Sequence, residues 1–230
     1  MKKKVKVAID GPSSSGKSTI AKLVAKHFNF TYIDSGSIYR AITYLAIKNN
    51  LIKTTFIDVV SLIDLLNNCS ISFSFNSDNQ NIIKLNGISI EKEIRTFEIS
   101  NYVSLVAEIN LIRKYVVKIQ KDISTNKSVV MDGRDIGSVV FPNADFKFFL
   151  DASLDIRSLR RWNELKLSEK DLKFEDVKKD LLKRDENDIN RKFSPLIRTK
   201  DSILIDSDQL NIVEVVSQII NIINKEIKNK

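Results

Sequence analysis

The first fifty residues of the chain alternate between two hydrophobic patterns. Residues 5–9 form a mostly apolar, β-branched run that ends at Asp10-Gly11-Pro12, which predicts a buried strand leading into a tight loop. Apolar residues then recur at helical spacing over 20–28 and over 38–46, and the short apolar pair at 32–33 is typical of a strand. This order of strand, helix, strand and helix predicts a parallel sheet with right-handed crossovers.

The pattern changes in the middle of the chain. Apolar residues alternate with serines from Ile71 to Phe75, and a second apolar run at 82–85 ends at Asn86-Gly87, a dipeptide typical of hairpin turns. Hairpin alternation does not belong to a doubly wound sheet. We therefore expect residues 58–106 to form a small antiparallel α+β insertion into a core made of residues 1–57 and 107–230.

The core pattern resumes after residue 128. Apolar runs at 129–132, 146–150 and 203–206 bring the predicted sheet to five strands, and residues 212–227 have the periodicity of a closing amphipathic helix. More than half of residues 157–192 are charged, so this segment is interpreted as a helical lid over a site, with an ordinary exposed helix pair as the alternative. The predicted fold class is α/β: a five-stranded parallel sheet flanked by helices, with an antiparallel insertion and a helical lid.

Composition narrows the class of protein. A chain of 230 residues with 43% hydrophobic and 29% charged residues suits one globular core, and six glycines and three prolines exclude collagen-like and low-complexity classes. No apolar run approaches the roughly eighteen residues of a membrane span. The run after the basic N-terminus ends at Asp10, too early for a signal peptide, so we expect a cytoplasmic protein with an intact N-terminus and no membrane partner.

Two residue types exclude further classes. The single Cys69 cannot form an internal disulfide, and the single His27 argues against a zinc enzyme and a Ser-His-Asp triad. The net charge of +8 favours anionic partners such as nucleotides, nucleic acid or a membrane surface, with a lysine-rich solvated surface as the alternative. Arginines are more informative than lysines here, because a guanidinium can grip phosphate or carboxylate through two hydrogen bonds.

The strongest motif is the P-loop at residues 11–18, in which Gly, four residues and Gly-Lys-Ser follow a predicted strand and precede a helix. Backbone N–H groups of such a loop and the helix N-terminus stabilise phosphate charge. We expect Lys17 to reach the β- and γ-phosphates of ATP, and Ser18 to hold the Mg²⁺ that accompanies ATP. The predicted ATP-binding residues are Gly11, Pro12, Ser13, Ser14, Ser15, Gly16, Lys17, Ser18 and Thr19.

Three more clusters of polar residues are predicted to lie on the side of the loop where the molecule that accepts the phosphoryl group would bind. Segment 34–40 places a serine at the end of the second strand and Arg40 one turn into a helix, at the edge where open α/β sheets bind ligands. Segment 132–135, Asp-Gly-Arg-Asp, lies at the tip of the third core strand, and Arg184, Asp188 and Arg191 share one helix face. Each cluster alone could be a surface salt bridge, but together behind a P-loop they favour an acceptor site.

With these motifs in place, the chain resembles the bacterial cytidylate kinases, of the nucleoside-monophosphate kinase group, over essentially its full length. The matching segments, in the family's order, are 10–13, 34–36 with 38–40, 93–96, 132–135 with 137 and 139–142, 149–153 and 184–191. The resemblance implies phosphoryl transfer from ATP to CMP or dCMP in pyrimidine nucleotide metabolism. Ser14-Ser15 departs from the Gly-Ala of many members, which leaves open how closely the loop wraps the phosphates.

The resemblance also implies roles for individual residues. The acceptor's phosphate would be held by Arg40, Arg134 and Arg191, and its ribose would be contacted by Ser35, Arg184 and Asp188. Cytosine would be read by Ser104, Arg113 and Asp135; a carboxylate can accept a hydrogen bond from the 4-amino group, where uracil presents an acceptor. Three residues match catalytic lid arginines that neutralise the transferred phosphoryl group: Arg157, Arg160 and Arg161.

Other classes stay open at this point. A P-loop switch GTPase needs an Asn/Thr-Lys-x-Asp run, and neither 126–129 nor 199–202 has Asp in the fourth position. A nucleic-acid-binding ATPase would explain the charge, but aromatic residues are 8% of the chain and are not interleaved with basic ones. Another small-molecule kinase on the same scaffold is the nearest alternative. We expect ATP and CMP or dCMP as partners, no nucleic acid, and a monomer.

Overall fold

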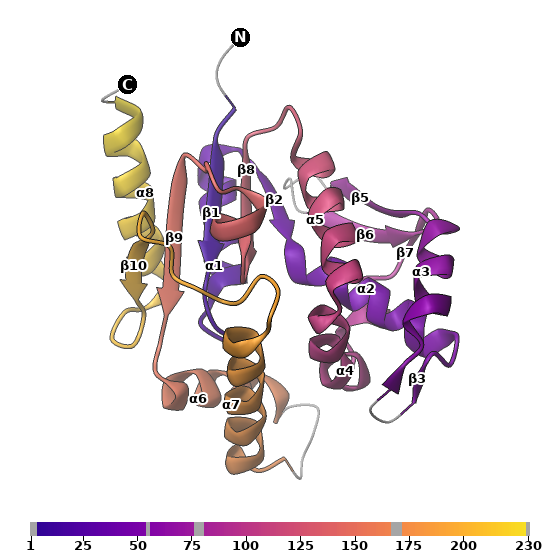
Figure 1. Cartoon of the computed structure of the whole chain (residues 1–230). Helices are drawn as coiled ribbons and strands as arrows, with labels where there is room; N and C mark the ends of the chain where they lie inside the picture. Colours follow the sequence, from indigo (N-terminus) through magenta and orange to yellow (C-terminus); the bar gives the residue numbers. More distant parts are fainter. Residues whose placement is uncertain (1–3, 54–55, 76–80, 167–171, 229–230) are drawn as a thin grey trace.

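The computed structural model describes residues 4–53, 56–75, 81–166 and 172–228, and the predicted five-stranded parallel sheet is confirmed. Its strands run in the order β10-β9-β1-β8-β2, and every neighbouring pair is parallel (Figure 1). The strands are β1 (Lys6–Asp10), β2 (Thr31–Asp34), β8 (Val129–Gly133), β9 (Phe146–Asp151) and β10 (Ile203–Asp206).

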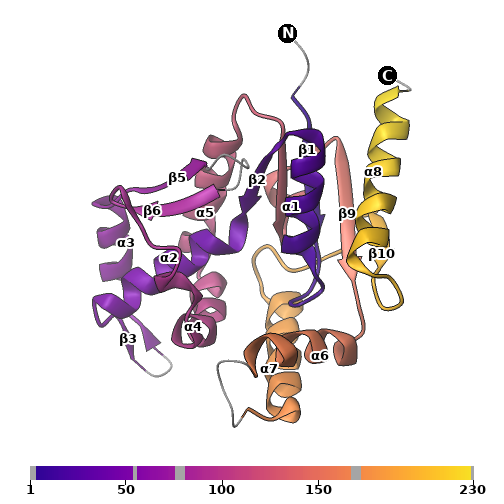
Figure 2. The same ribbon diagram turned by 180° about the vertical axis from the view of Figure 1, so that it is seen from behind.

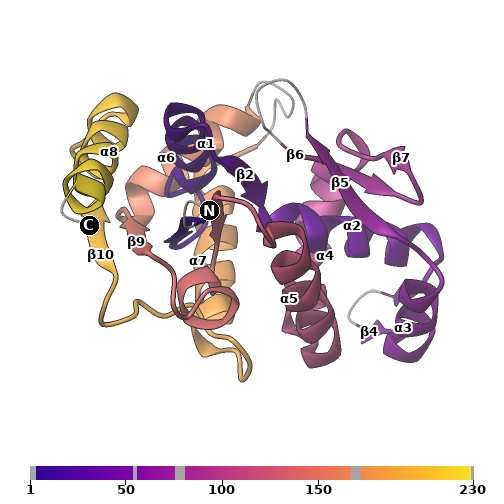
Figure 3. The ribbon, with the colours of Figure 1, turned by 90° about the horizontal axis from the view of Figure 1, so that it is seen from above.

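Helices cover both faces of the sheet, as Figure 3 shows from above. On one face, α1 (Lys17–Phe28) and α8 (Ile212–Lys228) pack on Val7 and Ile9 of β1. On the other face, α5 (Asn110–Ser124) and a short π-helix, η2 (Ile136–Val140), cover Ala8. Because β1 is buried on both faces, its sequence is a continuous apolar run rather than an alternating one.

The insertion lies at the end of the sheet beside β2 (Figure 2). The expected hairpin is present: β5 (Ile71–Phe75) pairs antiparallel with β6 (Asn81–Leu85), which pairs with β7 (Ile88–Ser89). Asn86 and Gly87 both have positive φ, 50° and 80°, as a two-residue hairpin turn requires. The other elements are β3 (Ile52–Lys53), β4 (Phe56–Ile57), α3 (Val59–Asn67), the 3₁₀-helix η1 (Glu93–Arg95) and α4 (Phe97–Glu108).

The hydrophobic cluster of the insertion extends beyond residues 58–106. It includes Ile42 and Leu45 of α2 (Ser35–Lys48) and Ile112 of α5, in addition to Leu62 and Ile83 from the insertion itself. The insertion therefore packs against α2 and α5, two helices that are connected in sequence to the sheet strands β2 and β8. The boundary at residues 58 and 106 stays a prediction.

The predicted lid contains two helices beyond the carboxyl ends of the strands, α6 (Leu154–Leu165) and α7 (Phe174–Asn190) (Figures 1 and 2). Residues 167–171 of the predicted lid segment lie outside the described residues. The two helices are joined by Trp162, whose Nε1 donates to the carbonyl of Leu172 at 3.0 Å and whose ring meets Phe174 edge-on. Within the described ranges, every helix is too short or too polar to cross a bilayer.

Candidate functional site

The phosphate loop contains backbone conformations that residues other than glycine rarely adopt. Gly11 has φ 152°, and a Cβ at this position would lie 2.0 Å from the carbonyl oxygen of Leu150, so only glycine fits. Ser14 and Gly16 also have positive φ, 59° and 91°, and α1 begins immediately afterwards at Lys17. The loop thus ends at the N-terminus of α1, the arrangement that favours bound phosphate.

A buried carboxylate fastens this loop to the next part of the site. Asp10, the last residue of β1, accepts hydrogen bonds from the N–H groups of Ile136 at 2.8 Å and Gly137 at 2.7 Å. Burial raises the pKa of Asp10 to about 6, although both N–H donors act in the opposite direction. Asp10 therefore fixes the backbone that follows β8 against the start of the loop.

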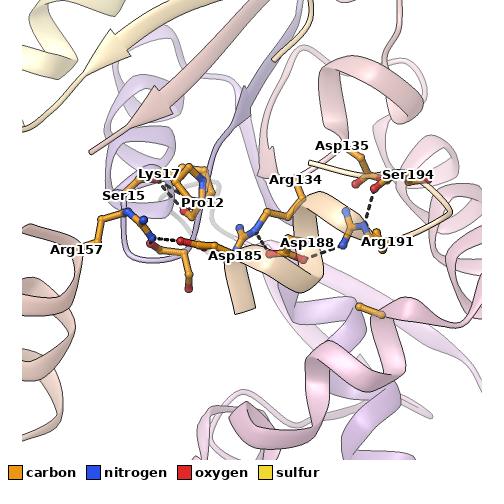
Figure 4. Close-up of polar contacts among 12 residues, drawn as sticks. Pro12, Ser15, Lys17, Arg134, Asp135, Arg157, Asp185, Asp188, Arg191 and Ser194 are labelled. Atoms are coloured by element: carbon orange, nitrogen blue, oxygen red, sulfur yellow. Dashed lines mark hydrogen bonds and ion pairs between the residues drawn. The ribbon is translucent and has the colours of Figure 1, made fainter. Parts of the chain in front are cut away.

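Lys17 is folded onto its own loop. The side chain is buried, and its Nζ lies 2.5 Å from the carbonyl oxygen of Pro12 and 3.4 Å from Ser15 Oγ (Figure 4). Burial, with the positive charge of Arg134 adding to it, lowers the pKa of Lys17 to about 7. A phosphate in the loop would supply a stronger partner than these neutral oxygens.

Ser18 and Asp132 form a pair of hard oxygen donors beside Lys17. Ser18 Oγ donates to Asp132 Oδ2 at 2.7 Å, and the hydroxyl of Tyr32 donates to Asp132 Oδ1 at 2.8 Å. Burial, with the charge of Asp34 adding to it, raises the pKa of Asp132 to about 6, although the hydrogen bond from Ser18 acts in the opposite direction. A loop serine and an aspartate at a strand end are the groups that hold Mg²⁺ in P-loop enzymes, so these residues fit that ion.

A cleft at the carboxyl edge of the sheet joins the loop to the acceptor clusters. Its lining includes Ser13, Ser14, Lys17 and Ser18 from the loop and α1. It also includes all nine residues predicted for the acceptor, namely Ser35, Arg40, Ser104, Arg113, Arg134, Asp135, Arg184, Asp188 and Arg191. The predicted residues outside this lining are Gly11, Pro12, Ser15, Gly16, Thr19 and the three lid arginines.

Two of the arginines that are predicted to hold the acceptor's phosphate bind one carboxylate of α7. Asp188 accepts from Arg134 Nε at 2.8 Å and from Arg191 Nη1 at 2.9 Å, while Arg191 Nε donates to the carbonyl of Ser194 (Figure 4). Burial alone would raise the pKa of Asp188, but the charges of Arg134 and Arg191 outweigh it and leave this pKa lowered. The third, Arg40, donates to Ser100 Oγ at 3.1 Å.

Several buried polar atoms of the cleft lack a protein partner. Among the residues that the structure describes, no hydrogen-bond partner is present for Tyr39 Oη, Arg113 Nε, Arg184 Nε or Arg191 Nη2. Burial, with the charge of Arg134 adding to it, also lowers the pKa of Arg184. Buried donors without partners are costly, and three of these four belong to guanidinium groups. The cleft is therefore suited to an anionic ligand with several oxygen acceptors.

The far end of the cleft holds a buried ion pair. Arg113 Nη2 lies 2.6 Å from Asp135 Oδ2, Arg113 Nη1 donates to the carbonyl of Ala107, and the guanidinium lies 5.4 Å from the centre of the Tyr39 ring. Asp135 thus braces Arg113. The pair offers a carboxylate and a guanidinium edge in an apolar setting, which suits recognition of a polar base.

The three predicted lid arginines do not belong to the lining of the cleft, but the charge of Arg161 acts on two arginines of that lining, Arg40 and Arg184. Arg157 Nη1 contacts the carbonyl of Ser13 at 3.2 Å and Asp185 Oδ2 at 2.5 Å (Figure 4). Arg160 binds the hydroxyl and carbonyl of Ser207 and reaches the carbonyl of Ser15 at 3.5 Å, and Arg161 pairs with Glu164. Two of the three, Arg157 and Arg160, therefore contact carbonyl oxygens of the phosphate loop.

Some lining residues were not assigned a role from the sequence. Asp132 carried a usable signal, since an acidic residue at the tip of a core strand is the usual partner of a P-loop serine. Tyr39, Val103 and Ala107 carried none, because their apolar spacing is also that of ordinary core positions. The remaining unassigned lining residues are Asp34, Gly36, Arg95 and Gly133.

Comparison with known proteins agrees with the resemblance seen in the sequence. The family profile described as cytidylate kinase matches residues 7–225. A curated protein named cytidylate kinase from Flavobacterium johnsoniae is 44% identical, covering 98% of this chain and 99% of its own length. Proteins of the same name from Clostridium tetani and Clostridium botulinum are 48% and 46% identical, covering 97% and 96% of this chain and 96% and 99% of their own lengths.

Proposed function

This chain belongs to the cytidylate kinase family, and we propose on that basis that it transfers the γ-phosphoryl group of ATP to CMP and dCMP. The observation that supports this activity most is the cleft itself. Lys17 and Ser18 of the phosphate loop share one lining with the nine acceptor residues, so donor and acceptor would meet in a single site. Bringing both reactants together in this way converts a bimolecular step into a unimolecular one.

In the proposed reaction, the donor half of the site acts by charge. Lys17 would leave the carbonyl of Pro12 for the phosphates of ATP, and Ser18 with Asp132 would hold the Mg²⁺ that ATP carries. When bound, that ion neutralises charge on the phosphates. Positive φ angles at Gly11 and Gly16 give the loop a tight turn, a conformation in which backbone N–H groups can bind phosphate oxygens.

The acceptor half would align the nucleophile. Arg134 and Arg191, with Arg40, would hold the phosphate of CMP, so that one of its oxygens attacks the γ-phosphorus and ADP leaves. Ser35, Arg184 and Asp188 would contact the ribose. The partnerless Nε of Arg184 and Nη2 of Arg191 are the donors that a nucleotide would satisfy. No protein nucleophile is needed in this reaction.

The proposal also assigns roles to the lid arginines and to the residues at the end of the cleft where the cytosine base would bind. Arg157 and Arg160 already touch the carbonyls of Ser13 and Ser15, and with Arg161 they are proposed to neutralise the transferred phosphoryl group. Ser104, Arg113 and Asp135 are proposed to read cytosine. We also propose that the protein acts as a cytoplasmic monomer without a nucleic-acid partner.

A coupled assay of ADP release tests this function. The acceptors are CMP, dCMP, UMP, AMP and shikimate, each with ATP and Mg²⁺, and one reaction without acceptor measures ATP hydrolysis. The proposal predicts the highest kcat/KM with CMP and dCMP. Equal or faster ADP release with AMP or shikimate would favour another kinase on the same scaffold.

A further inference from the structure

A tyrosine hydroxyl lies under the phosphate site. Tyr32 is only 2% exposed, and its ring belongs to the hydrophobic cluster beneath α1 that includes Val24 and Val130. Tyr32 is aligned with Val130 in the parallel pairing of β2 and β8, so Asp132 lies two residues further along β8 on the same face. The side chain of Tyr32 reaches across from β2 to Asp132, and its hydroxyl donates to Asp132 Oδ1 at 2.8 Å.

The two oxygens of Asp132 are held from two different elements. Oδ1 accepts from Tyr32 on the neighbouring strand, and Oδ2 accepts from Ser18 at the start of α1, at 2.7 Å. The Ser18 hydroxyl is also a proposed metal ligand, so its contact with Asp132 is the one that a cation would alter. The Tyr32 contact comes from the buried side and does not compete with a cation for Ser18.

The hydroxyl of Tyr32 is not required for packing. A phenylalanine would fill the same apolar space, and a hydroxyl buried among apolar side chains lowers stability unless it makes a hydrogen bond. Here the bond goes to a carboxylate that faces the phosphate loop. A donor that fixes a metal-binding carboxylate from behind is a recurrent feature of metal sites, and its removal typically weakens metal affinity about 10- to 100-fold.

We propose that Tyr32 is a positioning residue for the magnesium site, in which its hydroxyl holds the Asp132 carboxylate in the orientation that receives the cation accompanying ATP. This proposal rests on the proposed function, because the cation is the one that the donor nucleotide brings. Tyr32 contacts neither nucleotide nor metal in this account. Its effect passes through Asp132 alone.

The test measures binding of Mn²⁺ in place of Mg²⁺, by electron paramagnetic resonance, to the full chain with a non-hydrolysable ATP analogue. Tyr32→Phe is expected to weaken Mn²⁺ affinity about 10-fold or more while the affinity for CMP, measured by calorimetry, stays unchanged. Tyr115→Phe is the matched control, since its hydroxyl lies 3.5 Å from the carbonyl of Leu66 in the insertion. Wild-type Mn²⁺ affinity in Tyr32→Phe would overturn the proposal.

A double-mutant cycle separates positioning from a loss of folding. Asp132→Ala, which removes the oxygen that accepts from Tyr32, should weaken Mn²⁺ binding by itself, and adding Tyr32→Phe to it should cause no further loss. Equal losses from Tyr32→Phe in both backgrounds would mean that the tyrosine acts independently of Asp132, which contradicts the proposal. The result is distinguishable from failure of the proposed function, because Mn²⁺ binding is measured without an acceptor and CMP phosphorylation by the wild type is measured separately.

Discussion

Ser14 takes a backbone conformation that glycine adopts more easily. Its φ of 59° lies in the left-handed region, which costs an ordinary L-residue roughly 1 to 2 kcal/mol. This is also the position at which the sequence departs from the Gly-Ala of many cytidylate kinases. The serine therefore occupies a left-handed position that suits glycine, which adds local strain to the loop.

Ser14→Gly should therefore raise the free energy of unfolding, by roughly 0.5 to 1 kcal/mol after allowing for the greater freedom of glycine in the unfolded chain. Urea denaturation measures this change. Ser15→Gly is the control, because Ser15 is not among the described residues with positive φ, and this change should lower stability. A loss of stability in Ser14→Gly as large as that in Ser15→Gly would show that the loop is unstrained.

Lys17 is expected to take up a proton when ATP binds. Its pKa is lowered to about 7 in the ligand-free protein, so near pH 8 it is mostly neutral, and phosphate charge should raise this pKa and protonate it. Calorimetry in two buffers of different ionisation enthalpy should show uptake of up to about one proton per ATP near pH 8, and less near pH 6, where Lys17 is already charged. Lys17→Ala should abolish the uptake. Uptake that persists in this variant would assign the proton to another group.

Asp135 has an observed ion pair with Arg113 and a proposed role in reading cytosine, and one substitution can separate the two. Because it forms a buried ion pair with Arg113, Asp135→Asn should lower stability by about 3 kcal/mol or more, as a buried charge loses its partner. If Asp135 also reads cytosine, the ratio of kcat/KM for CMP over UMP should fall, because an amide can donate to the 4-carbonyl of uracil. An unchanged ratio would leave Asp135 as a brace for Arg113. Asp122→Asn, at an exposed position on α5, is the control.

Among the elements, strands β1, β8 and β9 could be predicted because most of their residues are buried on both faces. The edge strand β10 could be predicted from its short apolar run, although its Ile203 and Leu204 are exposed. The hairpin could be predicted because Asn86-Gly87 specifies its turn. The helix α5 was not predicted, although Ile112, Val116 and Ile119 recur at helical spacing. The pairing of β3 with β4 could not be predicted, because a two-residue strand is too short to show an alternation of apolar and polar residues.

The lid is better anchored than its charge suggests. Val177 and Leu181 of α7 are buried, Lys178 pairs with Asp155 of α6, and Asp185 of α7 pairs with Arg157. The composition of the segment does not reveal this packing, because two buried apolar residues and two ion pairs are enough to hold a mostly charged helix in place. The packing partners of a charged helix are set by the tertiary structure.

Hydrogen exchange tests whether α6 and α7 act as a lid. A bisubstrate analogue should slow exchange in both helices, because its phosphates would engage Arg157 in α6 and the ion-pair network around Asp188 in α7. Exchange in α8, which contributes no residue to the lining of the cleft, should stay the same. Equal protection of α6 and α7 with and without the analogue would make them a static surface.

At the scale of the whole molecule, the cleft is built where three parts meet: the sheet edge, the insertion and the lid. The sequence could predict which clusters face the acceptor, since strand tips of a parallel sheet share one edge. It could not predict that Asp188 pairs with Arg134, or that Tyr32 donates to Asp132, because these contacts join elements distant in the chain. Distances between clusters come from packing, which a linear pattern does not contain.

The cleft is proposed to select a cytosine nucleotide as the phosphoryl acceptor, and a competition between nucleotides in one reaction tests this selection. Equimolar CMP, UMP and AMP, each labelled in its base, are incubated together with the protein, ATP and Mg²⁺, and the labelled diphosphates are separated by ion-exchange chromatography. Base discrimination of about 1 to 3 kcal/mol predicts labelled CDP in roughly 5- to 150-fold excess over labelled UDP, and a small share of labelled ADP. Labelled ADP equal to or above labelled CDP would contradict the account.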